Sequence, residues 1–218
     1  MTDNQHQYSE QQRAAIYQVI GERRDMRHFI NKPIDEAIMQ RLFKVAHQAP
    51  SVGYMQPWRI IRIKTPQLRN DIYQLVDAER IKTAEALAER QQQFMRLKVE
   101  GINDCAELLV MALMDEREPH VFGRRTMPEM DLASVSCAIQ NMWLAARAEG
   151  IGMGWVSLFE PDDLAELLTM PKGAKAVAIL CLGHVKEFYP APMLAMENWR
   201  QQQPLEQFIF NDQWGQTD

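Results

Sequence analysis

Apolar side chains recur at helical spacing in two segments near the N-terminus. In the first, Ser9 and Gln12 form a capping-box pattern ahead of an apolar stripe, and Gly21 follows as a residue suited to the left-handed turn that ends a helix. The pattern therefore predicts a short helix between these positions. A second helix is predicted from Asp35 to His47, because its apolar positions share one face.

The strongest helical pattern lies in the second half of the chain. Thr126 and Glu129 form another capping-box pattern, Pro128 stands in the first turn, and Gly150 stops the segment. Large and small apolar side chains recur between them, which predicts a central helix from Thr126 to Glu149. These apolar positions are Leu132, Val135, Ile139, Met142, Trp143 and Ala146.

Apolar runs predict the strands. They are WRIIRIK at 58–64, the segment 106–114, GWVSLF at 154–159 and AVAILCLG at 176–183, with a short helix after Pro161. Helices separate these strands without a regular β-α-β alternation. The fold class is therefore predicted to be α+β.

The segment 67–99 is also helical in pattern, but it is strongly polar and carries charges on most faces. Such a segment is typical of a helix buried on one side only, or of a mobile lid. We expect a lid at about 67–99.

Length and charge narrow the class of protein. The 218 residues, 46% of them hydrophobic, contain no linker-like stretch and predict a single domain over 1–218. A net charge of −5 argues against a broad contact with nucleic-acid phosphates. The polar N-terminus lacks a secretory pattern, and no apolar run is long enough for a membrane span, which together favour a cytoplasmic location.

Cysteine and histidine positions do not predict a metal site or a disulfide. The three cysteines, Cys105, Cys137 and Cys181, lie far apart among apolar neighbours, so they are interpreted as reduced core residues. The five histidines show no ligand spacing.

A cluster of arginines follows the first predicted helix. Arg23, Arg24 and Arg27 fall within five residues, and guanidinium groups suit the bidentate capture of a phosphate, although a solvated basic patch has the same spacing. Asp25 stands between them. It either neutralises the arginines or is a carboxylate whose pKa the cations depress, ionised and able to take a proton.

The glycines at 150, 152 and 154 resemble a dinucleotide fingerprint only superficially. They end a predicted helix and begin a strand, which is the reverse of the order that a Rossmann site needs. We interpret them as positions where a flat ligand or another backbone comes close. Ser157 follows in the predicted strand, and no nucleophile-elbow pattern supports a hydrolase.

Several motifs in order resemble the flavin-dependent nitroreductase family over nearly the whole chain. They are RRDMRHF, APSVGYMQPW, AIQNMWLAARAEGIGMGWVSLF, AILCLGHV and NWRQQQPLEQFIF. Ordinary members have serine and asparagine where this chain has Asp25 and Met55. That departure, with FGRRTMPEMDLASV, resembles the BluB-type branch, the 5,6-dimethylbenzimidazole synthases.

The resemblance implies a fold and a reaction. The fold is a nitroreductase-like FMN-binding fold with a central mixed sheet flanked by helices, in an intertwined homodimer with a flavin at each of two interface sites. Reduced FMN is both the bound flavin and the substrate, which dioxygen fragments into 5,6-dimethylbenzimidazole, the lower ligand of cobalamin, and erythrose 4-phosphate. A flavin reductase using NAD(P)H supplies the reduced FMN.

The resemblance also implies the site residues. Asp25 matches an acid/base carboxylate and Ser157 a second catalytic residue, while Arg200 resembles a tail arginine that closes over the phosphate. The implied cofactor-binding set is Arg23, Arg24, Asp25, Met26, Arg27, Ser51, Gln56, Pro57, Gly154, Ser157 and Arg200. Two alternatives stay open: a conventional NAD(P)H-dependent FMN nitroreductase or flavin reductase, and a non-catalytic flavin-binding protein.

Overall fold

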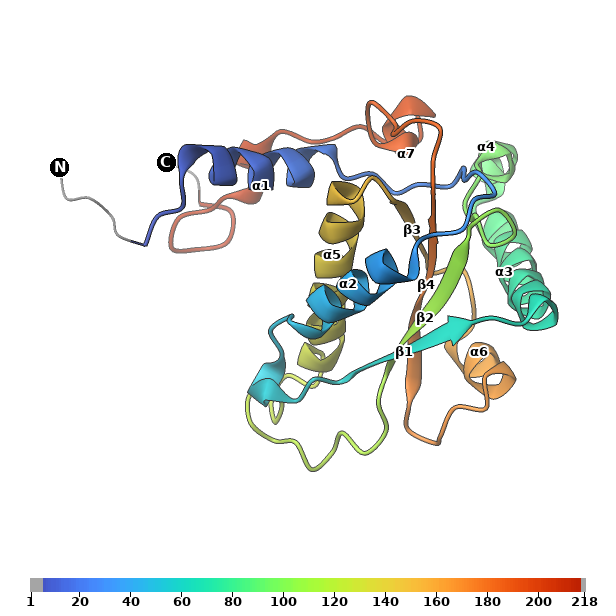
Figure 1. Ribbon diagram of the computed structural model, residues 1–218, viewed down its shortest axis with the longest axis horizontal. Helices are drawn as coiled ribbons and strands as arrows, with labels where there is room; N and C mark the ends of the chain where they lie inside the picture. Colours follow the sequence, from blue (N-terminus) through green and yellow to red (C-terminus); the bar gives the residue numbers. More distant parts are fainter. Residues whose placement is uncertain (1–5, 217–218) are drawn as a thin grey trace.

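The computed structural model describes residues 6–216 and is built around one four-stranded sheet (Figure 1). The strand order is β1-β2-β4-β3, and every pair of neighbouring strands is antiparallel. Their bounds are Trp58–Ile63 for β1, Glu107–Leu113 for β2, Gly152–Val156 for β3 and Lys175–Gly183 for β4. The parallel pairing expected of a mixed sheet is limited to an isolated bridge between Asp25 and Met153 at the β3 edge.

Helices cover both faces of the sheet (Figure 1). On one face lie α2 (Glu36–His47) and α5 (Met130–Ala148), packed against Leu109 and Met111 of β2. The other face packs against α3 (Pro66–Ala86) and α6 (Pro161–Leu167) through the alternate residues of β2. Because both faces are buried, β2 and β4 are apolar after their first residues, Glu107 and Lys175, which is why continuous apolar runs predicted them correctly.

The first helix, α1 (Glu10–Glu22), has the predicted capping box at Ser9. Gly21 does not end it in the left-handed conformation, so that expectation was wrong. The helix continues to Glu22, and the next residue turns into an extended conformation. Arg24 donates from Nη1 to the carbonyl of Gly21 at 2.7 Å, so a guanidinium satisfies one of the carbonyls that the end of the helix leaves without a helical partner.

The central helix α5 begins later than its pattern predicted. Thr126 and Glu129 form no capping box, because turns and bends occupy most of 122–129 and the helix starts only at Met130. Asp131, which is buried, binds both Arg117 and Arg124 there and ties the preceding loop to the first helical turn. The other end is as predicted, since Gly150 adopts φ of 72° just beyond the helix.

The polar segment 67–99 is helical, as predicted, but it is not one helix. It comprises α3 (Pro66–Ala86), the short 3₁₀ helix η2 (Ala88–Arg90) and α4 (Gln91–Arg96). Ala88 has a positive φ of 46°, which breaks the helical path between α3 and α4. The remaining short helices are η1 (Val52–Tyr54), α6 (Pro161–Leu167), α7 (Met193–Met196) and η3 (Leu205–Phe208).

Helix α1 and the C-terminal segment extend away from the body of the molecule on the same side (Figure 1). No residue of α1 is buried. Apolar side chains of both segments are exposed, including Ile16, Tyr17, Ile20, Leu205, Phe208 and Trp214. Leu132 of α5 is also exposed, at 48%, although its periodicity placed it among the core residues.

The cysteines divide into two groups. Cys105 and Cys181 are buried, as predicted, but Cys137 is exposed on α5, so its interpretation as a core residue was wrong. All three are free thiols. No helix in the described part of the chain combines the length and the hydropathy that crossing a membrane requires.

Candidate functional site

The arginine cluster lies on an extended segment between α1 and α2, against the β3 edge of the sheet. The Met26 backbone N–H donates to the carbonyl of Met153 at 2.9 Å, and Asp25 makes the parallel bridge to Met153. Met26 is fully buried, so the structure exposes no atom of this predicted cofactor-binding residue to a ligand. The two backbone contacts with Met153 place Asp25 and Arg27 next to Trp155.

Asp25 accepts two hydrogen bonds from fixed donors. Its Oδ1 accepts from the Trp155 backbone N–H at 2.9 Å, and its Oδ2 accepts from Arg27 Nη2 at 2.7 Å. Burial raises the pKa of Asp25 above its ordinary value, and this outweighs the lowering by Arg27 and by the Trp155 hydrogen bond. The hypothesis of a depressed pKa was therefore wrong, because sequence spacing shows the cations but not the loss of solvent.

Arg27 is held in a buried position beside Asp25. Its Nη2 also donates to the Trp155 carbonyl at 2.8 Å, whereas Nε and Nη1 are buried and have no hydrogen-bond partner among residues 6–216. Gly154 faces this guanidinium: a Cβ there would lie 2.5 Å from Arg27 Nη1 and 2.2 Å from the Met26 carbonyl oxygen. Only glycine permits this approach, as the glycine pattern predicted.

The other two arginines are positioned by contacts that the sequence did not reveal. The Arg23 guanidinium lies over the Trp143 ring, 4.5 Å from its centroid. Trp143 Nε1 donates to the carbonyls of Arg24 at 3.2 Å and Met153 at 3.0 Å. Trp143 was predicted only as an apolar helix position, and its indole N–H turns out to join the arginine segment to β3.

Tyr189 is a second residue that sequence reasoning missed. Its hydroxyl accepts from the Arg27 backbone N–H at 3.2 Å and lies 2.7 Å from His28 Nδ1. Arg24 Nη2 donates to the Pro190 carbonyl at 3.2 Å. These contacts bring the start of the C-terminal segment beside the arginines, and nothing in the local sequence pattern indicated them.

The donors of this cluster fit a phosphate group. Three of the buried nitrogens that have no partner in the described part of the chain belong to this cluster: Arg24 Nε, Arg27 Nε and Arg27 Nη1. A buried donor without a partner costs about 1–3 kcal/mol, more for a charged group, and an anionic ligand removes that cost. The cluster therefore has the charge and the free donors that a phosphorylated cofactor needs.

Ser157 lies one position beyond the end of β3, not within the strand as predicted. It is exposed, and its hydroxyl has no hydrogen-bond partner among residues 6–216. Its neighbour Leu158 packs with Phe94 of α4 and with Trp199. Ser157 is thus free to contact a ligand, and its neighbour packs against the helical segment 67–99.

The contact between α4 and the C-terminal segment is specific. Arg90 lies over the Trp199 ring at 3.4 Å from its centroid and donates from Nη2 to the Trp199 carbonyl at 3.0 Å. Phe94 packs on the same ring, with 6.1 Å between centroids. Arg200 follows directly and is exposed, so its position depends on this contact.

The predicted residues Ser51, Gln56 and Pro57 do not join the arginine cluster. Ser51 Oγ accepts from the Gln56 backbone N–H at 3.0 Å, and the neighbouring Val52 N–H donates to Ser134 Oγ at 3.1 Å. Figure 1 shows η1 near the opposite end of α5 from β3.

The Ser51, Gln56 and Pro57 loop and the arginine cluster are well separated along α5. The nine residue steps from Ser134 to Trp143 correspond to about 13.5 Å of α5, at about 1.5 Å per residue. One chain therefore carries both groups of predicted site residues without bringing them together.

Comparisons with known proteins agree on one family. Residues 20–184 match the nitroreductase family. The chain is 39% identical to a 5,6-dimethylbenzimidazole synthase of Rhodobacter capsulatus, covering 91% of this chain and 97% of the relative, and 42% identical to one of Rhodospirillum rubrum, covering 84% and 87%. It also resembles a solved BluB-like flavoprotein of Clostridium difficile 630, with a TM-score of 0.69, 18% identity, and 91% and 99% of the two chains covered.

Proposed function

Because this chain belongs to the nitroreductase family, in its 5,6-dimethylbenzimidazole synthase branch, we propose that it converts reduced FMN and dioxygen to 5,6-dimethylbenzimidazole and erythrose 4-phosphate. Reduced FMN supplies both the electrons for dioxygen and the atoms of the product. The observation that carries the proposal is Asp25, a carboxylate with a raised pKa at the position where ordinary family members have serine.

In this proposal Asp25 moves the proton of the carbon–hydrogen cleavage in the ribityl chain. The Trp155 N–H and Arg27 hold the carboxyl group in one orientation, through bonds of 2.9 Å and 2.7 Å. The raised pKa of Asp25 is closer to the operating pH than that of an ordinary aspartate, so its carboxylate is a stronger base. A serine hydroxyl has no comparable basicity, so the aspartate distinguishes this site from that of a conventional nitroreductase.

The arginines bind the phosphate of the flavin. Arg27 contributes its free Nη1 and Nε, and Arg24 its free Nε. Most other donors of Arg24 are engaged by backbone carbonyls, so Arg27 is the main contact and Arg24 mainly shapes the segment. This arrangement favours FMN over riboflavin, which lacks the phosphate.

Ser157 and the helical segment 67–99 complete the site in this proposal. The free hydroxyl of Ser157 orients the substrate beside Asp25. Segment 67–99 is the lid, held by Arg90 and Phe94 against Trp199, and it limits access of water and external electron acceptors. Arg200, directly after the Trp199 contact, closes over the phosphate.

A second copy of the chain completes each site. The Ser51, Gln56 and Pro57 loop lies far along α5 from the arginines, so it contacts the flavin held by the partner's arginines in an intertwined homodimer. The exposed apolar residues of α1, of the C-terminal segment and of α5 give such a dimer its apolar surface. A flavin reductase that oxidises NAD(P)H in the cytoplasm supplies the reduced FMN.

The test is a single-turnover reaction of the purified protein. The protein is mixed anaerobically with chemically reduced FMN, air is admitted, and the products are identified by mass. We expect 5,6-dimethylbenzimidazole and erythrose 4-phosphate. Quantitative return of oxidised FMN with hydrogen peroxide, together with NAD(P)H-dependent reduction of a nitroaromatic, would instead identify a conventional nitroreductase.

A further inference from the structure

The arginine segment is held between two parts of the molecule, and β3 is only one of them. On one side, the Met26 N–H donates to the Met153 carbonyl of β3 at 2.9 Å. The next N–H along the chain, that of Arg27, donates to the Tyr189 hydroxyl at 3.2 Å. Because successive N–H groups of an extended chain point in opposite directions, Tyr189 holds the segment from the side away from β3.

The Tyr189 hydroxyl holds a stretch of backbone that the sheet does not reach. After Met26, the next backbone anchor is the Ile30 N–H, which donates to the His184 carbonyl at 2.9 Å. Between these two anchors, the described part of the chain supplies one partner for a backbone N–H, and that partner is Tyr189. Loss of the hydroxyl would therefore leave this stretch without a backbone hydrogen-bond acceptor.

The hydroxyl has a second partner that fixes it in turn. His28 Nδ1 lies 2.7 Å from the Tyr189 oxygen, and the two rings meet edge to face with 6.1 Å between their centroids. A tyrosine hydroxyl can accept and donate at the same time. It accepts from the Arg27 N–H while it donates to a His28 Nδ1 that carries no proton. The ring therefore cannot turn without losing a hydrogen bond.

The residues on either side of Tyr189 are held by other arginines. The Phe188 ring lies against the Arg147 guanidinium of α5, with 4.2 Å between the guanidinium carbon and the ring centroid. The Pro190 carbonyl accepts from Arg24 Nη2 at 3.2 Å. Because both neighbours are held, α5 and the arginine segment fix the backbone that carries the Tyr189 side chain.

The backbone position of Arg27 decides where its guanidinium lies. Nη2 donates to Asp25 Oδ2 at 2.7 Å and to the Trp155 carbonyl at 2.8 Å, while Nε and Nη1 are buried without a partner among residues 6–216. Arg27 is buried as a whole, so its N–H has no ready access to water in place of Tyr189. A buried N–H without a partner is costly, so the backbone would shift, and the guanidinium would shift with it.

We propose that Tyr189 is a positioning residue for phosphate binding, whose hydroxyl fixes the Arg27 backbone so that the free guanidinium nitrogens face the phosphate of the flavin. This role rests on the proposed function in one respect, since it requires Arg27 to contact the phosphate. Tyr189 acts through Arg27 and needs no contact of its own with the flavin. Its loss therefore weakens the binding of a phosphorylated flavin and spares riboflavin.

The test is a double-mutant cycle with oxidised flavins, which needs no turnover. Affinities for FMN and riboflavin are measured by calorimetry for the wild type, Tyr189→Phe, Arg27→Ala and the double variant. One neutral hydrogen bond corresponds to about a 2- to 12-fold change in an equilibrium constant, so Tyr189→Phe should weaken FMN binding within that range and leave riboflavin binding unchanged. In the Arg27→Ala background the same substitution should cause no further loss of FMN affinity.

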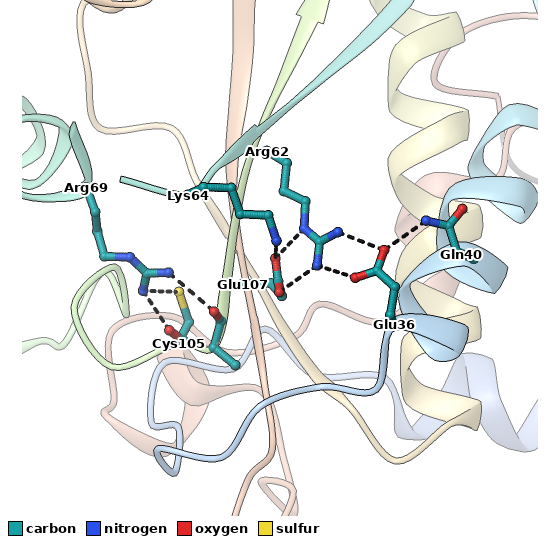
Figure 2. Close-up of polar contacts among 8 residues, drawn as sticks. Glu36, Gln40, Arg62, Lys64, Arg69, Cys105 and Glu107 are labelled. Atoms are coloured by element: carbon teal, nitrogen blue, oxygen red, sulfur yellow. Dashed lines mark hydrogen bonds and ion pairs between the residues drawn. The ribbon is translucent and has the colours of Figure 1, made fainter. Parts of the chain in front are cut away.

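Gln40→Ala is the matched control. Gln40 Nε2 donates to Glu36 Oε1 at 2.9 Å on α2, in the polar cluster around Arg62 (Figure 2). The variant loses one side-chain hydrogen bond outside the arginine segment, so both flavin affinities should stay at the wild-type values. Thermal unfolding checks that each variant is folded. If Arg27→Ala does not fold, the ratio of FMN to riboflavin affinity in Tyr189→Phe decides the question alone.

A wild-type FMN affinity of Tyr189→Phe, an equal loss for riboflavin, or a further loss in the Arg27→Ala background would overturn the positioning role. The yield of 5,6-dimethylbenzimidazole gives a second readout: Tyr189→Phe should reach the wild-type yield at saturating reduced FMN and fall below it at limiting reduced FMN. A wild type that makes no 5,6-dimethylbenzimidazole would refute the proposed function, while a selective loss of FMN affinity in Tyr189→Phe would still support the role of Tyr189.

Discussion

Asp25→Asn separates the chemical role of Asp25 from its structural role. The amide oxygen keeps the shape of the side chain and can still accept from the Trp155 N–H, which now donates to Oδ1 at 2.9 Å. What is lost is the negative charge and the 2.7 Å bond from Arg27 Nη2. We expect the variant to fold and to bind FMN but to make no 5,6-dimethylbenzimidazole.

The cost in stability is small for two reasons. A charge-assisted bond contributes about 1.5–3 kcal/mol. Although surrounding protein removes enough solvent to raise the pKa of the carboxyl group, 42% of the Asp25 side-chain surface remains exposed, and solvent screening there reduces that figure to about 1 kcal/mol. In the opposite direction, the uncharged Asn stabilises the folded state, because the variant no longer buries the charge of Asp25. We therefore expect a change in the midpoint of thermal unfolding of no more than about 2–4 °C for a chain of this size.

The raised pKa also fixes the sign of a pH effect. Since the folded-state pKa of Asp25 is above 3.8, its contribution to stability is complete below that pH and is lost as pH rises through the folded-state pKa. Asn does not ionise, so the variant does not lose stability in this way. Denaturant titrations should therefore show the variant gaining stability relative to the wild type as pH rises through this range, and the opposite slope would contradict the pKa direction.

The catalytic effect is far larger than the structural one. Acid–base catalysis contributes about 10²–10⁴ in rate, so we expect at least about 100-fold less 5,6-dimethylbenzimidazole per reduced FMN under air, with hydrogen peroxide in its place. The matched control is Glu149→Gln, which breaks a 2.7 Å pair with Arg41 and should leave the yield unchanged. A wild-type yield from Asp25→Asn would show that Asp25 only balances the charge of the arginines.

Three further predictions test the rest of the site. Arg27→Ala should weaken FMN binding about 10- to 100-fold by calorimetry and leave riboflavin binding nearly unchanged; an equal loss for both ligands would refute the phosphate contact. Sedimentation at low micromolar concentration should give one species near twice 25.3 kDa, whereas a folded monomer that binds flavin would contradict the shared site. Trp199→Ala removes the ring that contacts Arg90 and should raise the ratio of peroxide to 5,6-dimethylbenzimidazole; an unchanged ratio would show that the lid does not depend on this contact.

Local pattern in the sequence determined most of the secondary structure. The capping box at Ser9, the amphipathic face of α2 and the apolar runs of β2 and β4 predicted those elements correctly, because caps and periodicity act within a few residues. The local pattern failed at the start of α5. The α5 capping box at Thr126 gave way to the pairing of Asp131 with two loop arginines.

The sequence also indicated the chemical groups of the site, namely the arginine cluster, Asp25 and the permissive Gly154. The tertiary structure decided what these groups do. The pKa of Asp25 depends on how much solvent the fold removes, and the free donors of Arg27 depend on which carbonyls β3 presents.

Distances between segments far apart in the sequence were also decided only by the fold. The spacing of Ser51 from the arginines along α5 has no signature in either local segment. Residue types fix which interactions are available to a chain. Burial and proximity, which arise only when distant segments pack together, decide which of those interactions form.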